Sequence, residues 1–384
     1  MRIFYAYPEP LTPHRPRHLQ VWSTCRALAG HFEVVLAAAE RNEFGGGNSN
    51  PMIHCWPRRV TAGPISFSWQ ARFWRRCRHF IRQSPPDTIL YARHLRLADH
   101  LLRRCPGRPL IFELHEIFSE NPDIPRRHAE RLRAMEDRVF TQAAGLVAIT
   151  RGLVSALQSR YPDLPPCALA PDGCEPPDFS REPDPAVAPA DLIYAGSLHP
   201  WKGVRTLIQA MAFLPNRKLR VVGGTPAEVE ALRRLARQWK ASARCEWTGV
   251  VPYHQVSDHL RRAKIGVVPN HPHAISTDFT SPLKVFEYLA AGLPVLASDL
   301  PSLREVLDER VAVMFPAASP RSLAVAAEQL LSDEPGLARM SESARDRAQE
   351  FTWEKRAERI ARFLQSDDVD FYERALDRSC RATA

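Results

Sequence analysis

Short apolar runs alternate with amphipathic segments along almost the whole chain. In the first part the apolar runs are RIFYAY (2–7), FEVVLAA (32–38), TILYAR (88–93), PLIFELH (109–115) and GLVAIT (145–150). After residue 190 the series continues with DLIYAG (191–196), LRVVGG (219–224), CEWTGVV (245–251), IGVVPN (265–270), PVLASD (294–299) and VAVMFP (311–316). Segments with helical periodicity, such as 19–29, 126–143 and 204–211, lie between the runs. This alternation predicts an α/β fold with parallel sheets covered by helices.

One segment, residues 175–189, has no apolar periodicity and is rich in proline and acidic residues, which is typical of a linker. We therefore predict two Rossmann-like, doubly wound domains, at 1–178 and 187–365. Residues 366–384 are expected to form a helix that packs back on the N-terminal domain. Because such sheets bind ligands beyond the carboxyl ends of their strands, we expect the site in the cleft where the two domains face each other.

Charge and cysteine content restrict the partners and the compartment. The net charge of +9 favours an anionic partner, namely a nucleotide, a nucleic acid or an acidic membrane surface. We expect no nucleic acid, because the basic residues are dispersed and no reading helix or stacking platform is recognisable. The eight cysteines form no CxxC pair and are interpreted as free thiols in a reducing cytosol. The chain has neither a signal peptide at its start nor an apolar run of about 18 residues, which predicts a cytoplasmic protein.

The segment TDFTSPLKVFEYLAAG (277–292) contains two charges within an otherwise apolar helix. We expect Thr280 or Ser281 to be the N-cap and Pro282 to occupy the first helical position. The free amides and the dipole of such a helix N-terminus form an anion site. Lys284 stands at the end of the helix that disfavours a cation, so a bound anion explains it better than helix stability does.

Glu287 lies one turn beyond Lys284 on the same helix face. Its carboxylate could accept hydrogen bonds from the two hydroxyls of a ribose. A simple surface ion pair between Lys284 and Glu287 is the alternative. A second lysine, Lys202, lies in a loop after a predicted strand and just before a helix, where it could reach a diphosphate.

The order and spacing of several motifs resemble the C-terminal domain of retaining glycosyltransferases of family four, which have the GT-B fold. The motifs are G-x-L-x-x-x-K-G-V from Gly196, V-V-G-G, W-x-G-x-V, and the block SPLKVFEYLAAGLPVLASD from Ser281. The resemblance covers the second domain and, more weakly, the first. It implies a nucleotide-sugar donor, most often a UDP- or GDP-sugar, with no further cofactor and no metal.

The resemblance also implies the roles of individual residues. Lys202 would bind the donor diphosphate, and Glu287 would hold the ribose. His115, after a strand of the first domain, is similar to the active-site histidine of the family. These three are the expected catalytic residues, and the other expected donor-binding residues are Gly196, Ser197, Gly249, Val250, Val251, Asp278, Thr280, Ser281, Pro282, Leu283 and Lys284.

Two positions depart from the family pattern. Phe279 stands where the first glutamate of the E-x7-E motif is expected, with Asp278 beside it. Ser197 stands where the family usually has an arginine, and Lys284 could supply the missing second cation. His271 and His273 lack further ligands at metal spacing, so we expect no metal there.

Residues 66–82 (SFSWQARFWRRCRHFIR) form a basic amphipathic helix. Trp69, Phe73, Trp74, Cys77, Phe80 and Ile81 share one side, and five arginines fill the other. The helix either docks its apolar face in the core or lies on an anionic membrane, which would place the protein at the inner face of the membrane.

The expected function is retaining, metal-independent transfer of a sugar from a nucleotide-diphosphate donor to an acceptor hydroxyl. The acceptor would be a sugar, a lipid-linked molecule or another glycan of the cell envelope, as in polysaccharide synthesis. The alternative is a catalytically weak or inactive paralogue that binds nucleotide sugars as a scaffold, for which the departures at Phe279 and Ser197 are the support.

Overall fold

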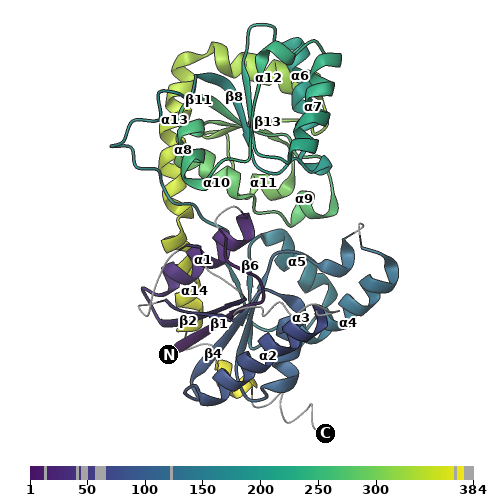
Figure 1. Ribbon diagram of the computed structural model, residues 1–384, viewed down its shortest axis with the longest axis vertical. Coiled ribbons are helices and arrows are strands. Elements are labelled where there is room, and N and C mark those ends of the chain that lie inside the picture. Colours follow the sequence, from purple (N-terminus) through teal and green to yellow (C-terminus); the bar gives the residue numbers. More distant parts are fainter. Residues whose placement is uncertain are drawn as a thin grey trace. The chain divides into compact units, whose positions relative to one another are not determined.

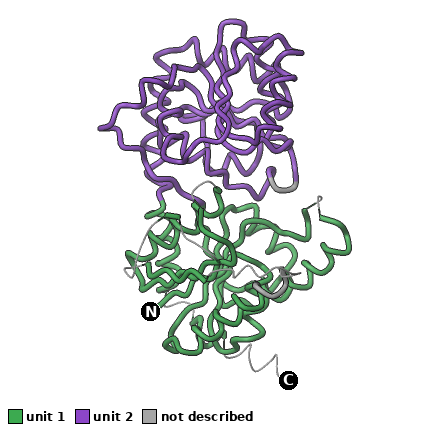
Figure 2. Tube along the Cα trace, viewed as in Figure 1, with its two compact units in different colours: residues 1–171, 353–384 green, residues 172–352 purple. Residues whose placement is uncertain are grey.

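The computed structural model describes residues 1–12, 15–39, 43–44, 51–56, 66–121, 124–366 and 370–375, without the side chains of 66–69 and 274–275. The chain forms two compact units, coloured separately in Figure 2. Unit 1 comprises residues 1–171 and 353–384, and unit 2 comprises residues 172–352. None of the helices in the described part of the chain is both long and apolar enough to cross a membrane.

Unit 1 is built on a parallel seven-stranded sheet with the order β3-β2-β1-β4-β5-β6-β7. The strands are β1 Arg2–Tyr7, β2 Glu33–Ala39, β3 Met52–Trp56, β4 Thr88–Ala92, β5 Leu110–Leu114, β6 Gly145–Ala148 and β7 Cys167–Leu169. The chain moves outward from β1 on one side and then returns to β4 on the other, so this sheet is doubly wound.

Helices cover both faces of this sheet, because right-handed crossovers in opposite directions place helices on opposite faces. Helices α1 (Pro16–Leu28) and α14 (Trp353–Leu364) pack against each other in one core cluster. The remaining helices are α2 Ser66–Gln83, α3 Leu95–Arg104, η1 Phe118–Glu120, α4 Arg126–Gln142 and α5 Arg151–Arg160. Figure 1 shows α2, α3 and α4 along one side of the unit.

Helix α2 contains the basic amphipathic segment, and its apolar side belongs to the core. Phe73, Cys77 and Ile81 are 3%, 0% and 2% exposed. The Phe80 ring stacks on Phe4 of β1, with ring centroids 5.1 Å apart. The docked-helix interpretation is therefore confirmed for residues 70–82. A membrane cannot use this face, because the apolar side chains are already packed; the side chain of Trp69 lies outside the described residues.

Unit 2 contains a parallel six-stranded sheet with the order β10-β9-β8-β11-β12-β13. The strands are β8 Ala190–Ala195, β9 Leu219–Val222, β10 Cys245–Gly249, β11 Ala263–Val268, β12 Val295–Ser298 and β13 Ala312–Phe315. The helical segments are η2 Pro200–Lys202, α6 Val204–Ala210, η3 Met211–Phe213, α7 Pro226–Gln238, η4 Ser242–Arg244, α8 Tyr253–Arg261, α9 Ala274–Asp278, α10 Leu283–Ala290, α11 Pro301–Arg304, α12 Pro320–Ser332, α13 Glu334–Ala348 and η5 Gln349–Phe351.

Alternate residues of the central strand β8 point into two different core clusters. Leu192 and Tyr194 pack with helices α6, α7 and α12, whereas Ile193 and Ala195 pack with α8, α10 and α13. A strand buried on both faces has no polar side, which explains why residues 192–195 (LIYA) form a continuous apolar run. The predicted pair of doubly wound parallel sheets is thus confirmed.

The boundaries between the units differ from the sequence prediction. The chain crosses between units at 171/172 and again at 352/353, rather than at 178–187 and 365. Helix α14, which we assigned to the C-terminal domain, belongs to unit 1 because its apolar face packs on α1 and the first sheet. Phe371, in the tail that we expected to return to this unit, is also buried in the same cluster.

The expected linker is attached to unit 2 rather than suspended between domains. Arg181 forms an ion pair of 2.5 Å with Asp258 of α8. Arg261 and Arg262, at the end of α8, donate hydrogen bonds to backbone carbonyls of the linker, including that of Pro183 at 3.2 Å. These contacts attach residues 178–183 to the C-terminal end of α8.

Candidate functional site

The order of strands in unit 2 points to the crevice beyond β8 and β11. From β8 the chain winds outward through β9 and β10, and it then returns to β11 on the other side of β8. Ligands of doubly wound sheets bind at such a switch point, beyond the carboxyl ends of the two strands. Lys202 lies in the loop that follows β8, and Asn270 comes two residues after β11.

The Lys202 loop is held in place by its neighbours on the sheet. The carbonyl of Trp201 accepts a hydrogen bond of 2.8 Å from the backbone N–H of His271. Gly203 has φ +70°, and a Cβ there would lie 1.6 Å from the carbonyl oxygen of Pro269. Only glycine can make this approach, so the motif K-G-V has a backbone reason as well as a chemical one.

Lys202 places its ammonium against an aromatic ring instead of an acid. Its Nζ lies 3.8 Å from the centroid of the Trp201 ring. Burial lowers the pKa of Lys202 to about 7. Among the described residues this ammonium has no ion pair with a carboxylate, so a bound anion can neutralise it.

Lys284, in the first turn of α10, is buried to a greater degree. Its side chain is 7% exposed, and its Nζ lies 3.5 Å from the centroid of the Tyr194 ring. Among the residues that the structure describes, this ammonium has no hydrogen-bond partner. Burial, reinforced by the charge of Lys202, lowers the pKa of Lys284 well below its ordinary value. The alternative of a surface ion pair with Glu287 is therefore wrong.

The ammonium of Lys284 lies beneath the end of β8. A Cβ at Gly196 would lie 3.1 Å from Nζ of Lys284, and Gly196 has φ +136°. The structure thus brings the expected residues Gly196, Lys202 and Lys284 together, and the two lysines are close enough to affect each other's charge. An unpartnered, buried ammonium costs several kcal/mol, which a protein tolerates most readily where a ligand compensates it.

Glu287 is half-buried on α10 and is hydrogen-bonded by Tyr253, the first residue of α8. Burial raises the pKa of Glu287, although the hydrogen bond from Tyr253 and the charge of Lys284 oppose this. The sequence did not indicate Tyr253, because nothing in the spacing links residues 253 and 287.

The N-terminus of α10 differs from the prediction. Pro282 is the N-cap residue and makes no side-chain cap, so neither Thr280 nor Ser281 caps the helix. Instead, the hydroxyl oxygen of Ser281 accepts a hydrogen bond of 3.2 Å from the backbone N–H of Asp172. Leu283 is the first helical residue. The amides at this end are consequently left without a side-chain cap.

The remaining expected donor-binding residues lie at nearby strand and helix ends. Gly249, at the end of β10, has φ +67° with open space around its Cβ position, and Val250 is 65% exposed. Asp278 ends α9, and Phe279 is 8% exposed, so a buried aromatic ring occupies the position of the expected first glutamate. Ser197 is exposed after β8.

The sequence did not reveal Asn270, which is fully buried. Neither atom of its side-chain amide has a hydrogen-bond partner among the described residues. A buried amide without partners costs about 1–3 kcal/mol per unsatisfied group. At the switch point, where ligands of such sheets bind, a bound ligand would supply the missing hydrogen bonds.

The two histidines of this segment have partners within unit 2. The His271 Nε2 atom lies 2.7 Å from the Thr206 hydroxyl. The His273 ring stacks on Trp201, with centroids 5.9 Å apart.

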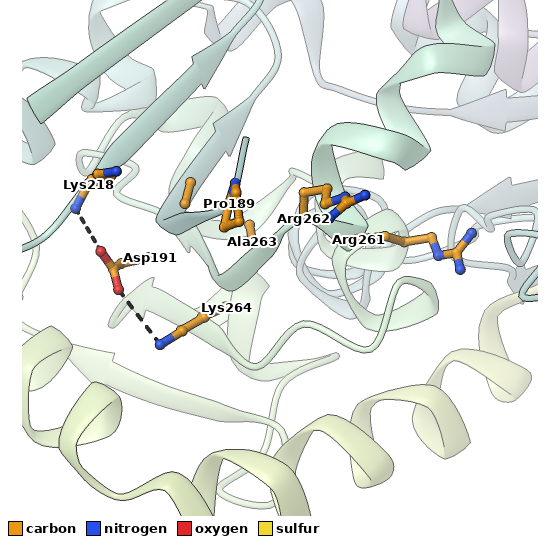
Figure 3. A pocket seen from close by; sticks show the side chains of 8 residues that line it. Pro189, Asp191, Lys218, Arg261, Arg262, Ala263 and Lys264 are labelled. Atoms are coloured by element: carbon orange, nitrogen blue, oxygen red, sulfur yellow. Dashed lines mark hydrogen bonds and ion pairs between the residues drawn. The ribbon is translucent and has the colours of Figure 1, made fainter. Parts of the chain in front are cut away.

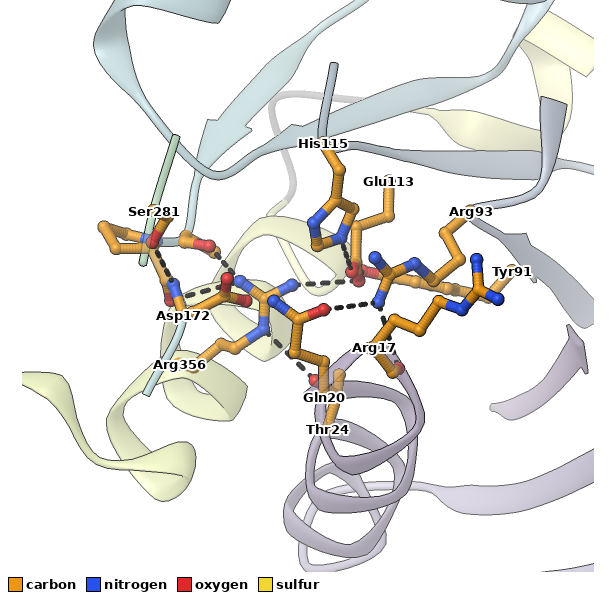
Figure 4. Close-up of polar contacts among 12 residues, drawn as sticks. Arg17, Gln20, Thr24, Tyr91, Arg93, Glu113, His115, Asp172, Ser281 and Arg356 are labelled. Carbon is orange, nitrogen blue, oxygen red and sulfur yellow. Dashed lines mark hydrogen bonds and ion pairs between the residues drawn. The ribbon is translucent and has the colours of Figure 1, made fainter. Parts of the chain in front are cut away.

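His115 belongs to unit 1 and follows strand β5 directly. Its Nε2 atom lies 2.5 Å from the carboxylate of Glu113, and its side chain is 14% exposed. Figure 4 shows this pair beside Tyr91 and Arg356.

A separate pocket of unit 2 lies at the amino ends of β8 and β11, the edge opposite to Lys202. Figure 3 shows its basic lining, with Asp191 between Lys218 and Lys264. The backbone N–H of Lys218 donates to this carboxylate at 2.8 Å, and the Lys264 ammonium lies 4.0 Å from it. Since Arg261 and Arg262 also hold the linker, the charges of this pocket have structural partners.

Comparison with known proteins agrees with this architecture. Residues 189–333 match the family model described as glycosyl transferases group 1. D-inositol 3-phosphate glycosyltransferase from Xylanimonas cellulosilytica is 29% identical over 242 residues, which are 58% of this chain and 57% of that protein. Thus the matched region spans little more than half the length of this curated relative.

Solved structures resemble the chain over almost its whole length. Sucrose-phosphate synthase from Thermosynechococcus elongatus has a TM-score of 0.75 at 19% identity, covering 95% of this chain and 98% of that one. HepE from Anabaena, solved in complex with UDP, has a TM-score of 0.72 at 16% identity, covering 95% and 99%. WaaG, a glycosyltransferase involved in lipopolysaccharide biosynthesis, has a TM-score of 0.67 at 16% identity, covering 95% and 100%. Residues 189–333 are thus similar to the glycosyl transferases group 1 family, and the chain has the GT-B fold.

Proposed function

We propose that this protein is a retaining glycosyltransferase that moves a sugar from a nucleotide-diphosphate donor to an acceptor hydroxyl. The observation that carries the proposal is the buried ammonium of Lys284, which has no partner among the described residues. Lys202 and the uncapped amides of α10 belong to the same edge of unit 2. A diphosphate would compensate all of these positive groups at once.

In the reaction, the bond between the anomeric carbon and the diphosphate oxygen breaks, and a bond to the acceptor oxygen forms. Negative charge develops on the departing diphosphate, where Lys202 and Lys284 would stabilise it. The acceptor proton would pass to the departing phosphate oxygen on the same face of the sugar. No described side chain is clearly placed as a nucleophile, so this front-face route is preferred to a covalent intermediate.

The donor's nucleoside would lie beyond α10. Glu287 would accept hydrogen bonds from the ribose hydroxyls, with Tyr253 orienting the carboxylate. The main chain at Gly249–Val251 would contact the base. We propose a UDP- or GDP-sugar as donor and no metal, because the two lysines would supply the charge that a divalent ion supplies elsewhere.

The acceptor would be a sugar, a lipid-linked molecule or another glycan, as in cell-envelope polysaccharide synthesis, at a cytoplasmic location. WaaG, which is similar to this chain in fold, is involved in lipopolysaccharide biosynthesis, and this supports the proposal of a cell-envelope acceptor. The arginines of α2 remain on the surface after its apolar side is packed, so contact with an anionic membrane face would be purely electrostatic.

The first experiment is a thermal-shift panel with UDP, GDP, ADP and their sugars. A ligand that binds only the folded state raises the melting temperature. The hit is then used as a labelled donor, and release of free sugar is measured without an acceptor. Lys202→Ala should abolish turnover and leave the melting temperature of the ligand-free protein nearly unchanged; full activity in this variant would remove Lys202 from the mechanism.

The second candidate function is that of an inactive nucleotide-sugar-binding paralogue. The buried Phe279 and the exposed Ser197, in place of a glutamate and an arginine, favour it. The same panel separates the two proposals, because a scaffold would bind a nucleotide sugar and release no sugar from it.

A further inference from the structure

A buried carboxylate in unit 1 contacts the histidine predicted for the active site. Glu113 is the fourth residue of β5 and is 1% exposed. Its Oε1 atom lies 2.5 Å from Nε2 of His115, the residue just after the strand. Adjacent strand residues point to opposite faces, so residues two apart share a side, which permits this contact.

The second carboxylate oxygen of Glu113 has two further partners. It accepts a hydrogen bond of 2.7 Å from the Tyr91 hydroxyl on the neighbouring strand β4. It also forms an ion pair of 2.9 Å with Nη2 of Arg356, whose side chain is 1% exposed. Thus the Tyr91 hydroxyl, the Arg356 guanidinium and the His115 ring all lie within hydrogen-bond distance of this carboxylate.

Arg356 belongs to α14, far along the chain from Glu113. It also donates a hydrogen bond of 3.2 Å to the Thr24 hydroxyl of α1 and one of 3.1 Å to the carbonyl of Pro171. These contacts hold the guanidinium in one orientation (Figure 4). The helix that returns from unit 2 therefore supplies the counter-ion of a carboxylate in the first sheet.

This surrounding keeps Glu113 ionised. Burial by itself would raise the pKa of Glu113, but the charge of Arg356 and the hydrogen bond from His115 outweigh it, so the pKa lies well below its ordinary value. An ionised carboxylate can only accept hydrogen bonds. The proton of the 2.5 Å contact must consequently be on Nε2 of His115.

We propose that Glu113, held by Arg356, is a positioning residue that fixes the ring orientation and the Nε2–H tautomer of His115. In the neutral ring the other nitrogen, Nδ1, then carries the lone pair. The fixed ring is the one that His115 would use in sugar transfer. This role rests on the proposed glycosyltransferase function, whereas the tautomer itself does not.

A purely structural role for the same contacts is the competing explanation. The Glu113–Arg356 pair also joins α14 to the sheet, and breaking a buried ion pair costs about 3–5 kcal/mol whatever its function. Stability alone cannot separate the two roles, so the test needs a readout at His115.

The kinetic test is a double-mutant cycle with Glu113→Gln and His115→Ala, using release of sugar from the nucleotide sugar identified by the thermal-shift panel. We expect Glu113→Gln to lower kcat about 10- to 100-fold, by analogy with the loss of a carboxylate that orients a metal-binding histidine. The donor KM should change less than threefold. In the His115→Ala background, Glu113→Gln should have no further effect on kcat.

Asp99→Asn is the matched control. Asp99 is also buried in unit 1 and paired with two arginines, Arg103 at 2.5 Å and Arg138 at 2.8 Å, but it lies on α3. It should lower the melting temperature and leave kcat of the folded protein unchanged. Multiplicative effects of the Glu113 and His115 changes on kcat would overturn the positioning role.

The second readout needs no activity. In ¹⁵N-histidine-labelled protein, the two-bond correlations of His115 should report the Nε2–H tautomer, with Glu113→Gln shifting the population toward Nδ1–H. If the glutamine variant does not fold, Glu113→Asp, which keeps the negative charge, is used in its place. The aspartate variant should retain the Nε2–H tautomer of His115. An unchanged tautomer in Glu113→Gln would refute the inference. If wild-type protein binds no nucleotide sugar, the proposed function fails while this spectrum still tests Glu113.

Discussion

Replacing Lys284 with methionine should stabilise the ligand-free protein and weaken nucleotide binding. Methionine matches the unbranched lysine side chain as far as Cε and lacks the ammonium. Replacing buried ionic groups with apolar ones is often stabilising by about 1–4 kcal/mol. The cation–π contact with the Tyr194 ring, whose centroid lies 3.5 Å from Nζ, already offsets about 1–2 kcal/mol of the cost of burying the ammonium.

With the middle of each range, the net gain should be about 1 kcal/mol in the free energy of unfolding. In a domain of this size each kcal/mol shifts the melting temperature by about 2–4 °C, so we expect a rise of about 2–4 °C. Binding should change in the opposite direction. Losing one charge-assisted hydrogen bond of about 1.5–3 kcal/mol weakens Kd for a nucleoside diphosphate about 10- to 150-fold.

Calorimetric melting without ligand and titration with UDP, or with GDP if the panel selects it, measure the two effects. Lys218→Met is the matched control, because Lys218 is exposed at the opposite edge of the same sheet. It should change neither quantity appreciably. A Lys284→Met protein that melts earlier than wild type and binds the nucleotide equally well would refute the reasoning.

The pH dependence of stability provides an internal check. The pKa of Lys202 is about 7 in the folded protein, against an ordinary value of 10.5, and that of Lys284 is also lowered. Between these values the unfolded chain binds more protons, so the free energy of unfolding should rise with pH from about 7 to 10.5. Lys284→Met should reduce the slope.

Three further predictions concern the same edge of unit 2. Because a diphosphate favours the charged form of Lys202, nucleotide binding should take up protons above pH 7, and the affinity should fall as the pH rises. Proton uptake makes the measured binding enthalpy depend on the ionisation enthalpy of the buffer. Equal binding enthalpies in all buffers would contradict this prediction. Gly203→Ala should lower the free energy of unfolding by at least about 2 kcal/mol in urea titrations, because φ is +70° and the added Cβ would clash with the Pro269 carbonyl. A variant as stable as the wild type would contradict the backbone conformation of Gly203. Asn270→Ala should leave the free energy of unfolding unchanged or raise it by about 1–3 kcal/mol. The same change should weaken binding of the nucleotide sugar more than binding of the free nucleotide. Equal weakening of both ligands would exclude a contact between Asn270 and the sugar.

Apolar patterning predicted most of the sheet strands, because central parallel strands are buried on both faces and read as continuous apolar runs. Strands β3 and β7 were missed. The residues of β3 and β7 are half-buried, and β7 has only three residues, so neither gives a continuous apolar run. Both are edge strands of the sheet, and edge strands need not be continuously apolar because they are less buried.

The predicted site was located through motifs whose spacing reflects local structure. Lys202, Lys284 and Glu287 follow from loops and helix ends, which the sequence marks with glycine, proline and charge. The contacts that these three side chains make were not predictable from the sequence. The pairing of Lys284 with aromatic Tyr194 rather than with Glu287 depends on how α10 packs beneath β8, and no local pattern encodes that.

The sequence by itself determined the two sheets, their helices, and the positions of Lys202 after β8 and Lys284 at the start of α10, because periodicity and glycine placement are local properties. Only the tertiary structure decided that α14 belongs to unit 1 and that Arg356 neutralises Glu113 beside His115. It also decided that the amide of Asn270 is buried with no hydrogen-bond partner in the part of the chain that the structure describes. An amphipathic or charged segment shows that it needs a partner. Which partner it finds depends on contacts between residues hundreds of positions apart.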